Sequence, residues 1–415
     1  MRTKIISLLI LAFLLIPIYT WAVTFEDPIT SLAKDPRALG MAGAMTALGD
    51  SPTSAIFNPA LMGEYNSFTL KAGLGSAPVD ETTLESLNKF VEYLKMFMND
   101  QEPPDDELSG NVFLTGYANL GIGRVGLTLW GDASPSFNYY KATYTTYTLF
   151  EANVYLDSNF DANGALTIAL PIINSRDLKL SVGANFRVNI NGYAKPIKID
   201  SKLTPAGLAL ETYSENTGFE NYLKVEDYEE LYKYWVLDLG GYLKLSDNFA
   251  LGISAQNVYG QGIEGDIHHH IKYYHWEIDT QSGEPILVYD STYTDGPYYI
   301  SSDQINIPPL TLKAGALLKV PTLNTRVAFD VDLNNNFQPV LYRLGVEQPL
   351  LVFVVRGGAI LDPNFTPLYY TLGAGVNLLF IRVDAGLGYL AQGSIVETIQ
   401  NTQPLVASIS GSIQF

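Results

Sequence analysis

KLSVGANFRVNING, residues 179 to 192, alternates between two kinds of side chain along its length. The even positions from Leu180 to Ile190 are apolar, and the odd positions from Ser181 to Asn191 are small or polar. Successive side chains of a β-strand point to opposite faces, so the stretch predicts a strand with one apolar and one wet face. It is longer than the roughly 5 to 6 residues of an ordinary strand, and it suits the roughly 9 to 11 tilted residues that cross a bilayer.

One such stretch can arise by chance in 415 residues, so the fold prediction depends on its repetition. Strands are expected at 66–74, 112–121, 123–131, 162–171, 178–192, 231–245, 249–259, 308–320, 325–334, 340–348, 351–361, 368–377, 380–391 and 404–415. Short turns alternate with longer connections, which include 75–111, 132–161, 193–230 and 260–307. An even strand number and two unlike rims are typical of bacterial barrels. The sequence thus predicts an all-β fold, a 14-stranded antiparallel transmembrane β-barrel at residues 65–415 with long extracellular loops.

Both ends of the chain carry export signals. Residues 1–22 combine Arg2 and Lys4 with an apolar run and a small residue at Ala22, which is typical of a secretory signal peptide cut after that residue. The last residues alternate from Ala407 to Phe415 and stop on an aromatic side chain, which resembles the assembly signal of Gram-negative outer-membrane proteins. We therefore expect a barrel in the outer membrane, with membrane lipid and the barrel assembly machinery as partners.

Composition excludes several classes of function. Cysteine is absent and histidine occurs four times, which removes disulfide scaffolds, thiol chemistry and most zinc sites. The net charge of −18 becomes −20 when the signal peptide with its two positive charges is removed, and this makes nucleic acid an unsuitable partner. We expect no cofactor and no enzymatic activity.

Residues 23–64 do not have the alternation of a barrel. Asp35-Pro36, Asp50-Ser51-Pro52 and Asn58-Pro59 each place an Asp or Asn at or just before a proline, the arrangement of a helix N-cap followed by the first helical residue. Short capped helices joined by glycine-rich turns would make a compact plug. We therefore expect a small helical N-terminal hatch in the lumen of the barrel.

The motifs of this segment resemble the FadL/PorV superfamily of outer-membrane barrels. The run RALGMAGA, which holds Gly40 and Gly43, is followed by Asn58, Pro59 and Ala60 at the start of an exported barrel. The resemblance implies that Asn58, Pro59 and Ala60 belong to a hatch folded inside the lumen. The family usually continues with Gly then Leu, whereas this chain continues with residues 61 and 62 before its next glycine, so the turn that leaves the hatch is expected to differ.

Two functions are compatible with such a barrel. The superfamily includes transporters of long-chain fatty acids and aromatic hydrocarbons, which implies uptake of a hydrophobic or amphipathic small molecule. It also includes barrels that serve as anchors in protein secretion, which implies a secreted or surface protein as the partner. An apolar patch in the lumen would favour transport.

Charges on the inward faces of the later strands are candidates for holding the hatch. Both signs are interspersed, at Arg326, Asp330, Asp332, Arg343, Glu347, Arg356, Arg382 and Asp384. Intermingled charges suit buried ion pairs with a plug better than the separated charges of a wide porin. The expected partners in the hatch are Arg37, Asp35 and Asp50, with Arg37 facing Asp330, Asp332, Glu347 and Asp384. A water-filled lining without hatch contacts is the alternative.

Two further features lie nearer the expected extracellular rim. The third strand is expected to end near Gly131 and Pro135, where a kink would open the wall sideways, or where an extracellular loop simply begins. His268 and His270 share a face of an extended segment in the longest loop and are weak candidates for a divalent metal, although an incidental polar cluster is favoured. An amphipathic helix is expected between residues 82 and 98, lying either on the barrel rim or on a ligand-gathering surface.

Overall fold

The computed structural model describes residues 28–49, 51–76, 85–86, 88–90, 92–93, 96, 104–144, 149–175, 178–203, 222–278, 285–391 and 406–415. The expected signal peptide and Asp50 lie outside these residues. Among the described residues, none of the helices has the length and apolarity needed to span a membrane. The signal peptide and its cleavage after Ala22 stay predictions.

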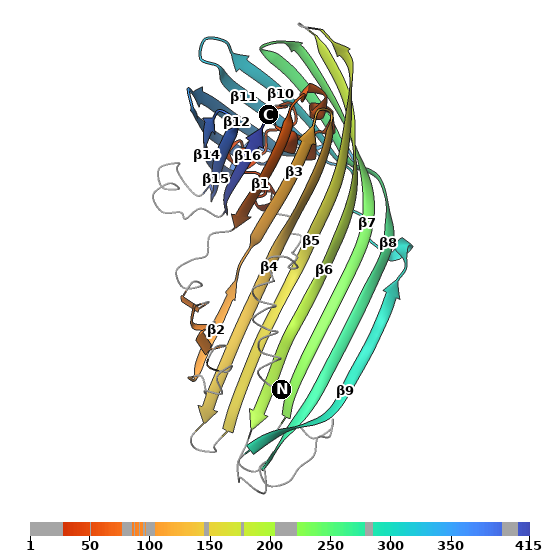
Figure 1. The fold of residues 1–415 in the computed structure, drawn as a ribbon, viewed down its shortest axis with the longest axis vertical. Helices are drawn as coiled ribbons and strands as arrows, with labels where there is room; N and C mark the ends of the chain where they lie inside the picture. Colours follow the sequence, from red (N-terminus) through yellow and green to blue (C-terminus); the bar gives the residue numbers. More distant parts are fainter. Residues whose placement is uncertain are drawn as a thin grey trace.

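The strands close into an antiparallel β-barrel (Figure 1). The ring consists of β1 (Phe68–Ser76), β3 (Leu114–Ile122), β4 (Val125–Tyr144), β5 (Leu149–Asn174), β6 (Lys179–Leu203), β7 (Tyr222–Ser246), β8 (Phe249–Ile278), β10 (Thr311–Val320), β11 (Thr325–Leu333), β12 (Pro339–Leu350), β13 (Phe353–Leu361), β14 (Pro367–Leu378), β15 (Ile381–Leu390) and β16 (Val406–Gln414). Pairing of β8 with β10 closes it. Two of the 16 strands, β2 (Asp106–Asn111) and β9 (Pro285–Ile300), lie outside the ring, and the barrel therefore has the predicted 14 strands.

The expected long loops were largely wrong, because five strands continue far beyond the barrel. Strands β4 to β8 have 20 to 30 residues, whereas β10 to β16 have 9 to 12. Most of 132–161 and parts of 193–230 and 260–307 are paired strand, extended at the two edges by β2 and β9. Figure 1 shows these strands as a curved wall on one side of the molecule, below the closed ring. We call this part the wall extension and define it by residues 132–144, 149–161, 193–203, 222–230 and 260–278 together with β2 and β9.

In β6, the alternating side chains that predicted the barrel lie on two different faces, with apolar residues outward and polar residues toward the lumen. Its apolar residues Val182 and Phe186 are 42% and 47% exposed, whereas Ser181 and Asn185 are 0% and 2% exposed. Because an outward apolar band is the solvent contact of a membrane barrel, this is the face expected against lipid. The last strand follows the same rule and pairs with β1, where Phe415 and Phe68 exchange backbone hydrogen bonds of 2.9 and 3.1 Å.

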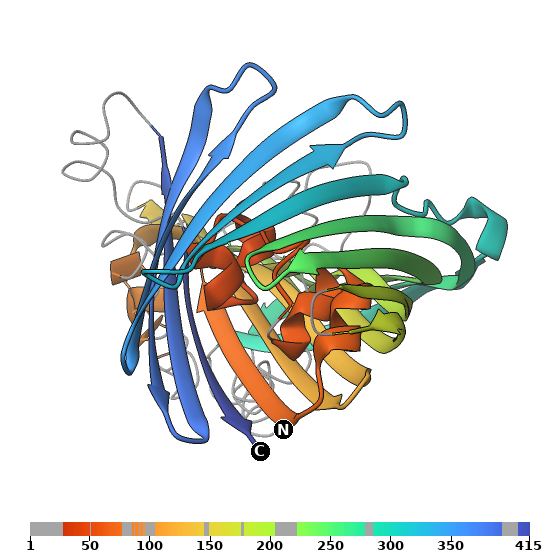
Figure 2. The same cartoon turned by 90° about the horizontal axis from the view of Figure 1, so that it is seen from above.

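Short helices fill the ring from inside (Figure 2). They are η1 (Thr30–Leu32), α2 (Pro36–Gly40), η2 (Pro52–Ile56) and η3 (Pro59–Glu64), and β1 follows directly. Each of the last three begins with a proline after an extended N-cap residue. Asp35 and Asn58 cap with their side chains as expected, whereas Ser51 makes no such bond. Proline suits the first helical position because its fixed φ is already helical. The N–H group that proline lacks would have no acceptor within the helix at this position.

The amphipathic segment is helical at the described positions from 85 to 96. Phe90 and Tyr93 pack against Leu108 of β2 and against Phe137 and Tyr139 of β4. The ring centroids of Phe90 and Phe137 are 4.9 Å apart. The helix thus lies against the wall extension, and its first expected residue, Thr82, is outside the described residues.

Another outer segment covers an edge of β8. After β9, η5 (Ser302–Gln304) leads into β10, and Ile305 packs with Tyr234 and Val236 of β7. Asn257 of β8 donates a hydrogen bond of 3.1 Å to the Pro309 carbonyl oxygen. Strand β8 pairs with β10 up to Gln256 and with β9 from Gly265. Side-chain contacts of the segment between β9 and β10 therefore cover the part of the β8 edge that lies between these two pairings.

Candidate functional site

The candidate site is the contact between the hatch and the lumen wall. We define the hatch by its described residues, 28–49 and 51–64. Its side chains form the largest buried apolar cluster, which includes Leu39, Met41 and Met45. Side chains and backbone of the hatch reach nearly every strand of the ring, and the contacts fall into three groups.

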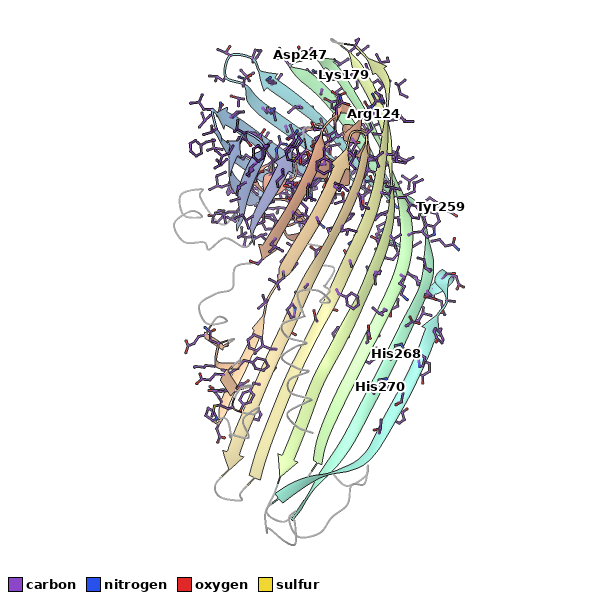
Figure 3. All side chains as sticks on the ribbon, viewed as in Figure 1. Arg124, Lys179, Asp247, Tyr259, His268 and His270 are labelled. Atoms are coloured by element: carbon purple, nitrogen blue, oxygen red, sulfur yellow. The ribbon has the colours of Figure 1, made fainter. Side chains whose placement is uncertain are left out.

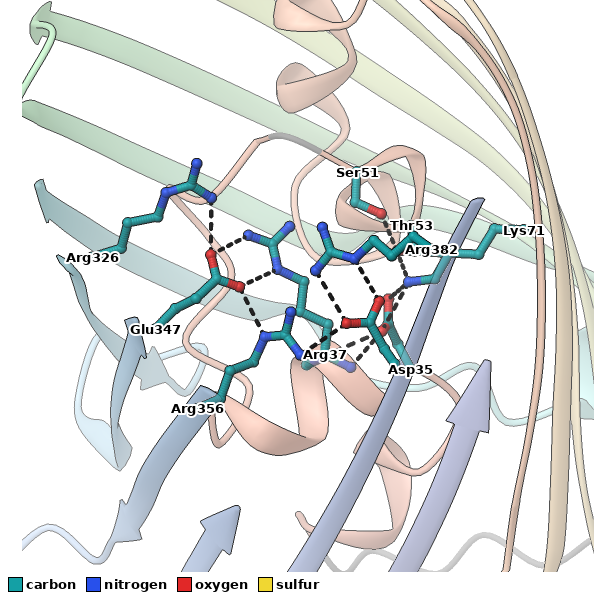
Figure 4. A network of polar contacts seen from close by, with 11 residues as sticks. Asp35, Arg37, Ser51, Thr53, Lys71, Arg326, Glu347, Arg356 and Arg382 are labelled. Carbon is teal, nitrogen blue, oxygen red and sulfur yellow. Dashed lines mark hydrogen bonds and ion pairs between the residues drawn. The ribbon is translucent and has the colours of Figure 1, made fainter. Parts of the chain in front are cut away.

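The first group is an ion-pair network around Glu347 of β12 (Figure 4). Arg37 of α2 binds the Glu347 carboxylate with two nitrogens, Nε to Oε2 and Nη2 to Oε1, each at 2.9 Å. Arg356 Nε and Arg326 Nη1 donate to the same carboxylate at 2.8 and 2.9 Å. Arg37 and Glu347 are 1% and 2% exposed. One buried carboxylate is therefore shared by three arginines, one from the hatch and two from the wall.

The other predicted acidic residues make different contacts. Asp384 pairs with Arg356 and Arg382 at 2.9 and 2.7 Å, which links it to Glu347 through Arg356. Asp332 pairs with Arg343 at 2.8 Å. Arg343 Nη1 in turn donates to the Ala42 carbonyl oxygen of the hatch at 3.1 Å. These two carboxylates thus bind wall arginines.

Asp35 contributes a second hatch ion pair. Lys71 of β1 lies 3.0 Å from Asp35 Oδ2 and donates to Thr53 at 3.3 Å. Asp35 also accepts from the backbone N–H of Arg37 at 2.9 Å, as the N-cap of α2. Burial alone would raise the pKa of Asp35, but the Lys71 ammonium and the hydrogen bonds from Thr53 and the Arg37 N–H hold it below its ordinary value. The hatch carboxylate is therefore charged and matched at neutral pH.

The second group consists of hydrogen bonds between side chains and backbone. Asn58 Nδ2 donates to the Thr46 carbonyl oxygen at 2.8 Å and to the Gly241 carbonyl oxygen of β7 at 3.0 Å. Its Oδ1 accepts from the Ala60 N–H at 3.1 Å, while Asp330 accepts from the Thr46 N–H at 2.8 Å. One asparagine thus caps a helix, closes a hatch loop and attaches both to the wall.

Side-chain amides of the wall also donate hydrogen bonds to the hatch backbone. Asn185 of β6 donates to the Ala55 carbonyl oxygen at 2.9 Å, and Gln256 of β8 donates to the Ile56 carbonyl oxygen at 3.0 Å. Both acceptors lie in η2, whose short length leaves carbonyl groups without partners inside the helix. The wall therefore completes the hydrogen bonding of a helix that could not complete it alone.

The third group is a set of wall glycines against which the hatch backbone lies. A Cβ atom built on Gly345 would lie 2.6 Å from the Met41 carbonyl oxygen, and one on Gly183 would lie 2.5 Å from the Pro59 carbonyl carbon. The same closeness to hatch atoms occurs at Gly240, Gly252, Gly358, Gly373, Gly386 and Gly388. At Gly183, Gly252, Gly345 and Gly386 the neighbouring atoms are hatch backbone, so a larger residue there would displace the hatch, whereas at Gly388 they belong to the Ile29 and Leu39 side chains.

The remaining predicted residues are placed as follows. Gly40 packs against Gly373 of β14, with 2.9 Å between its constructed Cβ and the Gly373 Cα. Gly43 has φ of 79°, a left-handed conformation that glycine adopts without strain. Pro59 and Ala60 begin η3 and touch Gly183 and Gly240. Whether these residues act in transport stays a proposal.

The expected end of the third strand near Gly131 and Pro135 was wrong. Strand β4 continues to Tyr144, and Gly131 and Pro135 pair with Ala162 and Ser158 of β5 without a shift of register. The Pro135 carbonyl oxygen still accepts from the Val112 N–H at 2.9 Å. A proline is tolerated because its place on the strand needs only the carbonyl group on that side. The described ladder leaves no gap in the wall at these residues.

The histidines also lie on a strand and not on a loop. His268 and His270 are in β8, on the wall extension, as Figure 3 shows. His270 Nδ1 is 3.1 Å from Thr294 Oγ1 of β9. Among the described residues, no three His, Cys, Asp or Glu side chains gather closely enough to hold a metal ion.

Sequence reasoning missed several residues that hold the hatch. Lys71, Asn185 and Gln256 are ordinary polar positions of alternating strands, and nothing local marks them as hatch contacts. The wall glycines carried a signal, since glycine is otherwise depleted in strands. Their recurrence at alternate positions, as in Gly386 and Gly388, indicated that another chain segment lies close to that face.

Several solved structures match the chain over most of its length. The chain is similar in fold to monoaromatic hydrocarbon channels. It matches the CymD monoaromatic hydrocarbon channel with 13% sequence identity and a TM-score of 0.45, over 92% of this chain and 98% of the other. It matches the toluene transporter TbuX of Ralstonia pickettii with 11% identity and a TM-score of 0.48, again over 92% and 98%. A mutant of the TodX monoaromatic hydrocarbon channel gives 11% identity and 0.46 over the same shares.

No family model matches the chain, and no curated protein matches it. Identities of 11 to 13% at these TM-scores concern the fold alone.

Proposed function

We propose that this protein is an outer-membrane barrel of the FadL/PorV type that admits hydrophobic or amphipathic small molecules. The observation that carries the proposal is the hatch, whose contacts run around the lumen wall from β1 through β7 to β15. A barrel closed in this way is unsuited to free diffusion of ions. It suits a solute that is first bound and then released, either past the hatch or through the wall.

The outer side of the molecule supports the same proposal. The wall extension carries an aromatic cluster formed by Phe90, Tyr93, Leu108, Phe137 and Tyr139. A second cluster joins Tyr234 and Val236 to Ile305. Apolar and aromatic side chains with few polar groups are typical of pockets for small ligands. Both clusters are buried, so an apolar compound that enters between the wall extension and the segments covering it would meet these side chains before it reaches the hatch. The solved channels reported above are named for such compounds.

Binding in detergent micelles tests the proposal. Isothermal titration of the purified barrel with toluene and with a long-chain fatty acid should give micromolar dissociation constants for at least one of them, which corresponds to about −8 kcal/mol. Empty micelles provide the blank, because both compounds partition into detergent. Absence of binding above this blank for both compounds would contradict the proposal.

The second candidate is an anchor for a secreted or surface protein. Strand β9 pairs with β8 and has no further strand beside it among the described residues. Tyr293 and Tyr299 on this strand are 52% and 74% exposed. An open edge with exposed tyrosines can receive an added strand from a partner. A protein that co-purifies with the native barrel and is lost when β9 is shortened would favour the anchor.

A further inference from the structure

A polar patch on the lumen wall lies next to the hatch. We call it the amide patch and define it by Asp161, Asn163, Arg187, Asn189 and Asn191. Asn163 of β5 is paired with Asn189 of β6, and Asp161 is paired with Asn191. Directly opposite residues of an antiparallel pair share a face, so these four side chains stand in two adjacent rows. Leu166 of β5 and Val188 of β6, at positions of the opposite face, are 45% and 36% exposed.

Aromatic side chains flank one row at both ends. Trp130 of β4 is paired with Asn163, and Tyr234 of β7 is paired with Asn189. Trp130 packs with Ile56 of the hatch, and the hatch ammonium Lys34 Nζ is 5.9 Å from its ring centroid. The amide patch therefore begins where the hatch ends, on the side of the wall extension.

The patch contains polar atoms that the protein does not satisfy. Asp161 Oδ1, Asn163 Nδ2, Arg187 Nε, Asn189 Nδ2 and Asn191 Oδ1 are buried and have no hydrogen-bond partner among the described residues. Asn163 and Asn189 are only 7% and 2% exposed. A buried polar group without a partner costs about 1 to 3 kcal/mol, and most buried polar groups in folded proteins have partners.

Two asparagines on the same face of β6 differ in their contacts. Asn185, four residues nearer the short turn, uses its amide on the hatch carbonyl of Ala55. Asn189 has the same side chain on the same face and has no such acceptor. The hatch therefore satisfies the wall amides that it reaches and leaves those beyond it available to something else.

The kinds of unsatisfied atom restrict the ligand. Three are donors, on Asn163, Arg187 and Asn189, and two are acceptors, on Asp161 and Asn191. A hydrocarbon would leave all five unsatisfied. A carboxylate only accepts, and it would face the charge of Asp161 with Asp132 paired beside it. Hydroxyl groups both donate and accept, and an aromatic or alkyl body can lie against Trp130 and Tyr234.

We infer that the amide patch binds the hydroxyl end of a neutral amphipathic ligand that carries at least two hydroxyl groups. This inference rests on the proposed uptake of small amphipathic molecules, and it names the class of substrate. The hatch lies beside the bound ligand, so release requires the hatch to move or the ligand to leave along the wall.

Three probes with one methylbenzene body test the inference. Toluene, 3-methylcatechol and 3-methylbenzoate are titrated into the barrel in micelles, with empty micelles as the blank. The catechol should bind at least tenfold more tightly than toluene and more tightly than the benzoate. The variants N189L and N163L should each reduce the preference for catechol over toluene about tenfold.

Stability provides a second readout and a control. Because the leucine variants remove unsatisfied buried amides, each should unfold at a temperature no lower than the native protein without ligand. T371V is the matched control, since Thr371 Oγ1 of β14 is also buried without a partner among the described residues but lies across the ring. It should leave the catechol preference unchanged.

Equal binding of catechol and toluene would overturn the inference while leaving the proposed uptake of hydrophobic molecules standing, and ordered water would then fill the patch. An unchanged preference in both leucine variants would overturn it as well. If the native protein binds none of the three probes above the micelle blank, both the proposed function and the inference are contradicted.

Discussion

The variant E347Q should detach the hatch and convert a closed barrel into a conducting one. The carboxylate of Glu347 is shared by Arg37, Arg326 and Arg356 at 2.8 to 2.9 Å. Glutamine keeps the volume but removes the charge, so three guanidinium groups lose their shared anion. Removing one partner of a buried ion pair typically costs about 3 to 5 kcal/mol. We expect a loss of that order in the free energy of unfolding, with added ion conductance in planar bilayers.

The matched control for this variant is E264Q. Glu264 lies on the wall extension, where its side chain is 55% exposed and pairs with Lys233 at 3.1 Å. Exposed pairs contribute about 0 to 1 kcal/mol, so stability and conductance should stay close to the native values. R37A should reproduce the effect of E347Q, because it removes the hatch side of the same pair. If E347Q and R37A behave like E264Q, the network does not hold the hatch.

The variant G345V should have a comparable effect for a steric reason. A Cβ on Gly345 would meet the Met41 carbonyl oxygen at 2.6 Å and the Met41 Cβ at 3.1 Å. Backbone atoms of the hatch cannot retreat while α2 remains bound to Glu347, so valine forces the hatch away from β12. Overpacking of this kind typically costs about 1 to 3 kcal/mol. The ring itself should still form, which its heat-modifiable mobility in gel electrophoresis would report, while ion conductance rises.

Gly411 of β16 provides the comparison for this steric argument. A Cβ there would meet nothing within 4 Å, so G411V should keep both the native mobility and the low conductance. Valine also suits a strand better than glycine does. Equal conductance in the two variants would mean that hatch contact at Gly345 does not keep the lumen closed.

The strands of the ring were predictable from the sequence because each has lipid on one face. That requirement produces alternation such as Val182, Ala184 and Phe186 against Ser181 and Asn185. It gives the number of ring strands, whereas β4 to β8 each extend about ten to twenty residues beyond one predicted end. The wall extension was not predictable in this way. Residues 193–203 and 222–230 are paired with one shift of register at Lys195–Lys198, and their alternation of apolar and polar residues is weak. Where the two faces of a strand do not meet different solvents, apolar and polar residues need not alternate. The sequence of such a strand then resembles that of a loop.

The hatch contacts were predictable in kind but only partly in detail. Intermingled inward charges indicated ion pairs with a plug, and the pair of Arg37 with Glu347 is formed. Asp332 and Asp384 bind wall arginines instead, because Arg343 and Arg382 lie beside them on neighbouring or the same strands. Sequence spacing does not tell which of several nearby cations a carboxylate takes. Lys71 went unnoticed because a single lysine in a strand usually lies at a surface.

Ion conductance of single native barrels in a planar bilayer tests the closed hatch most directly. Residues 28–49 and 51–64 lie in the lumen, where Arg37 pairs with Glu347 and Asp35 pairs with Lys71, and we expect this packing to leave no continuous water path. Native protein should therefore show only small, infrequent current steps, while E347Q and G345V in the same membrane show large ones. A large and steady conductance of the native barrel, unchanged in these two variants, would contradict the closed hatch and favour an open porin.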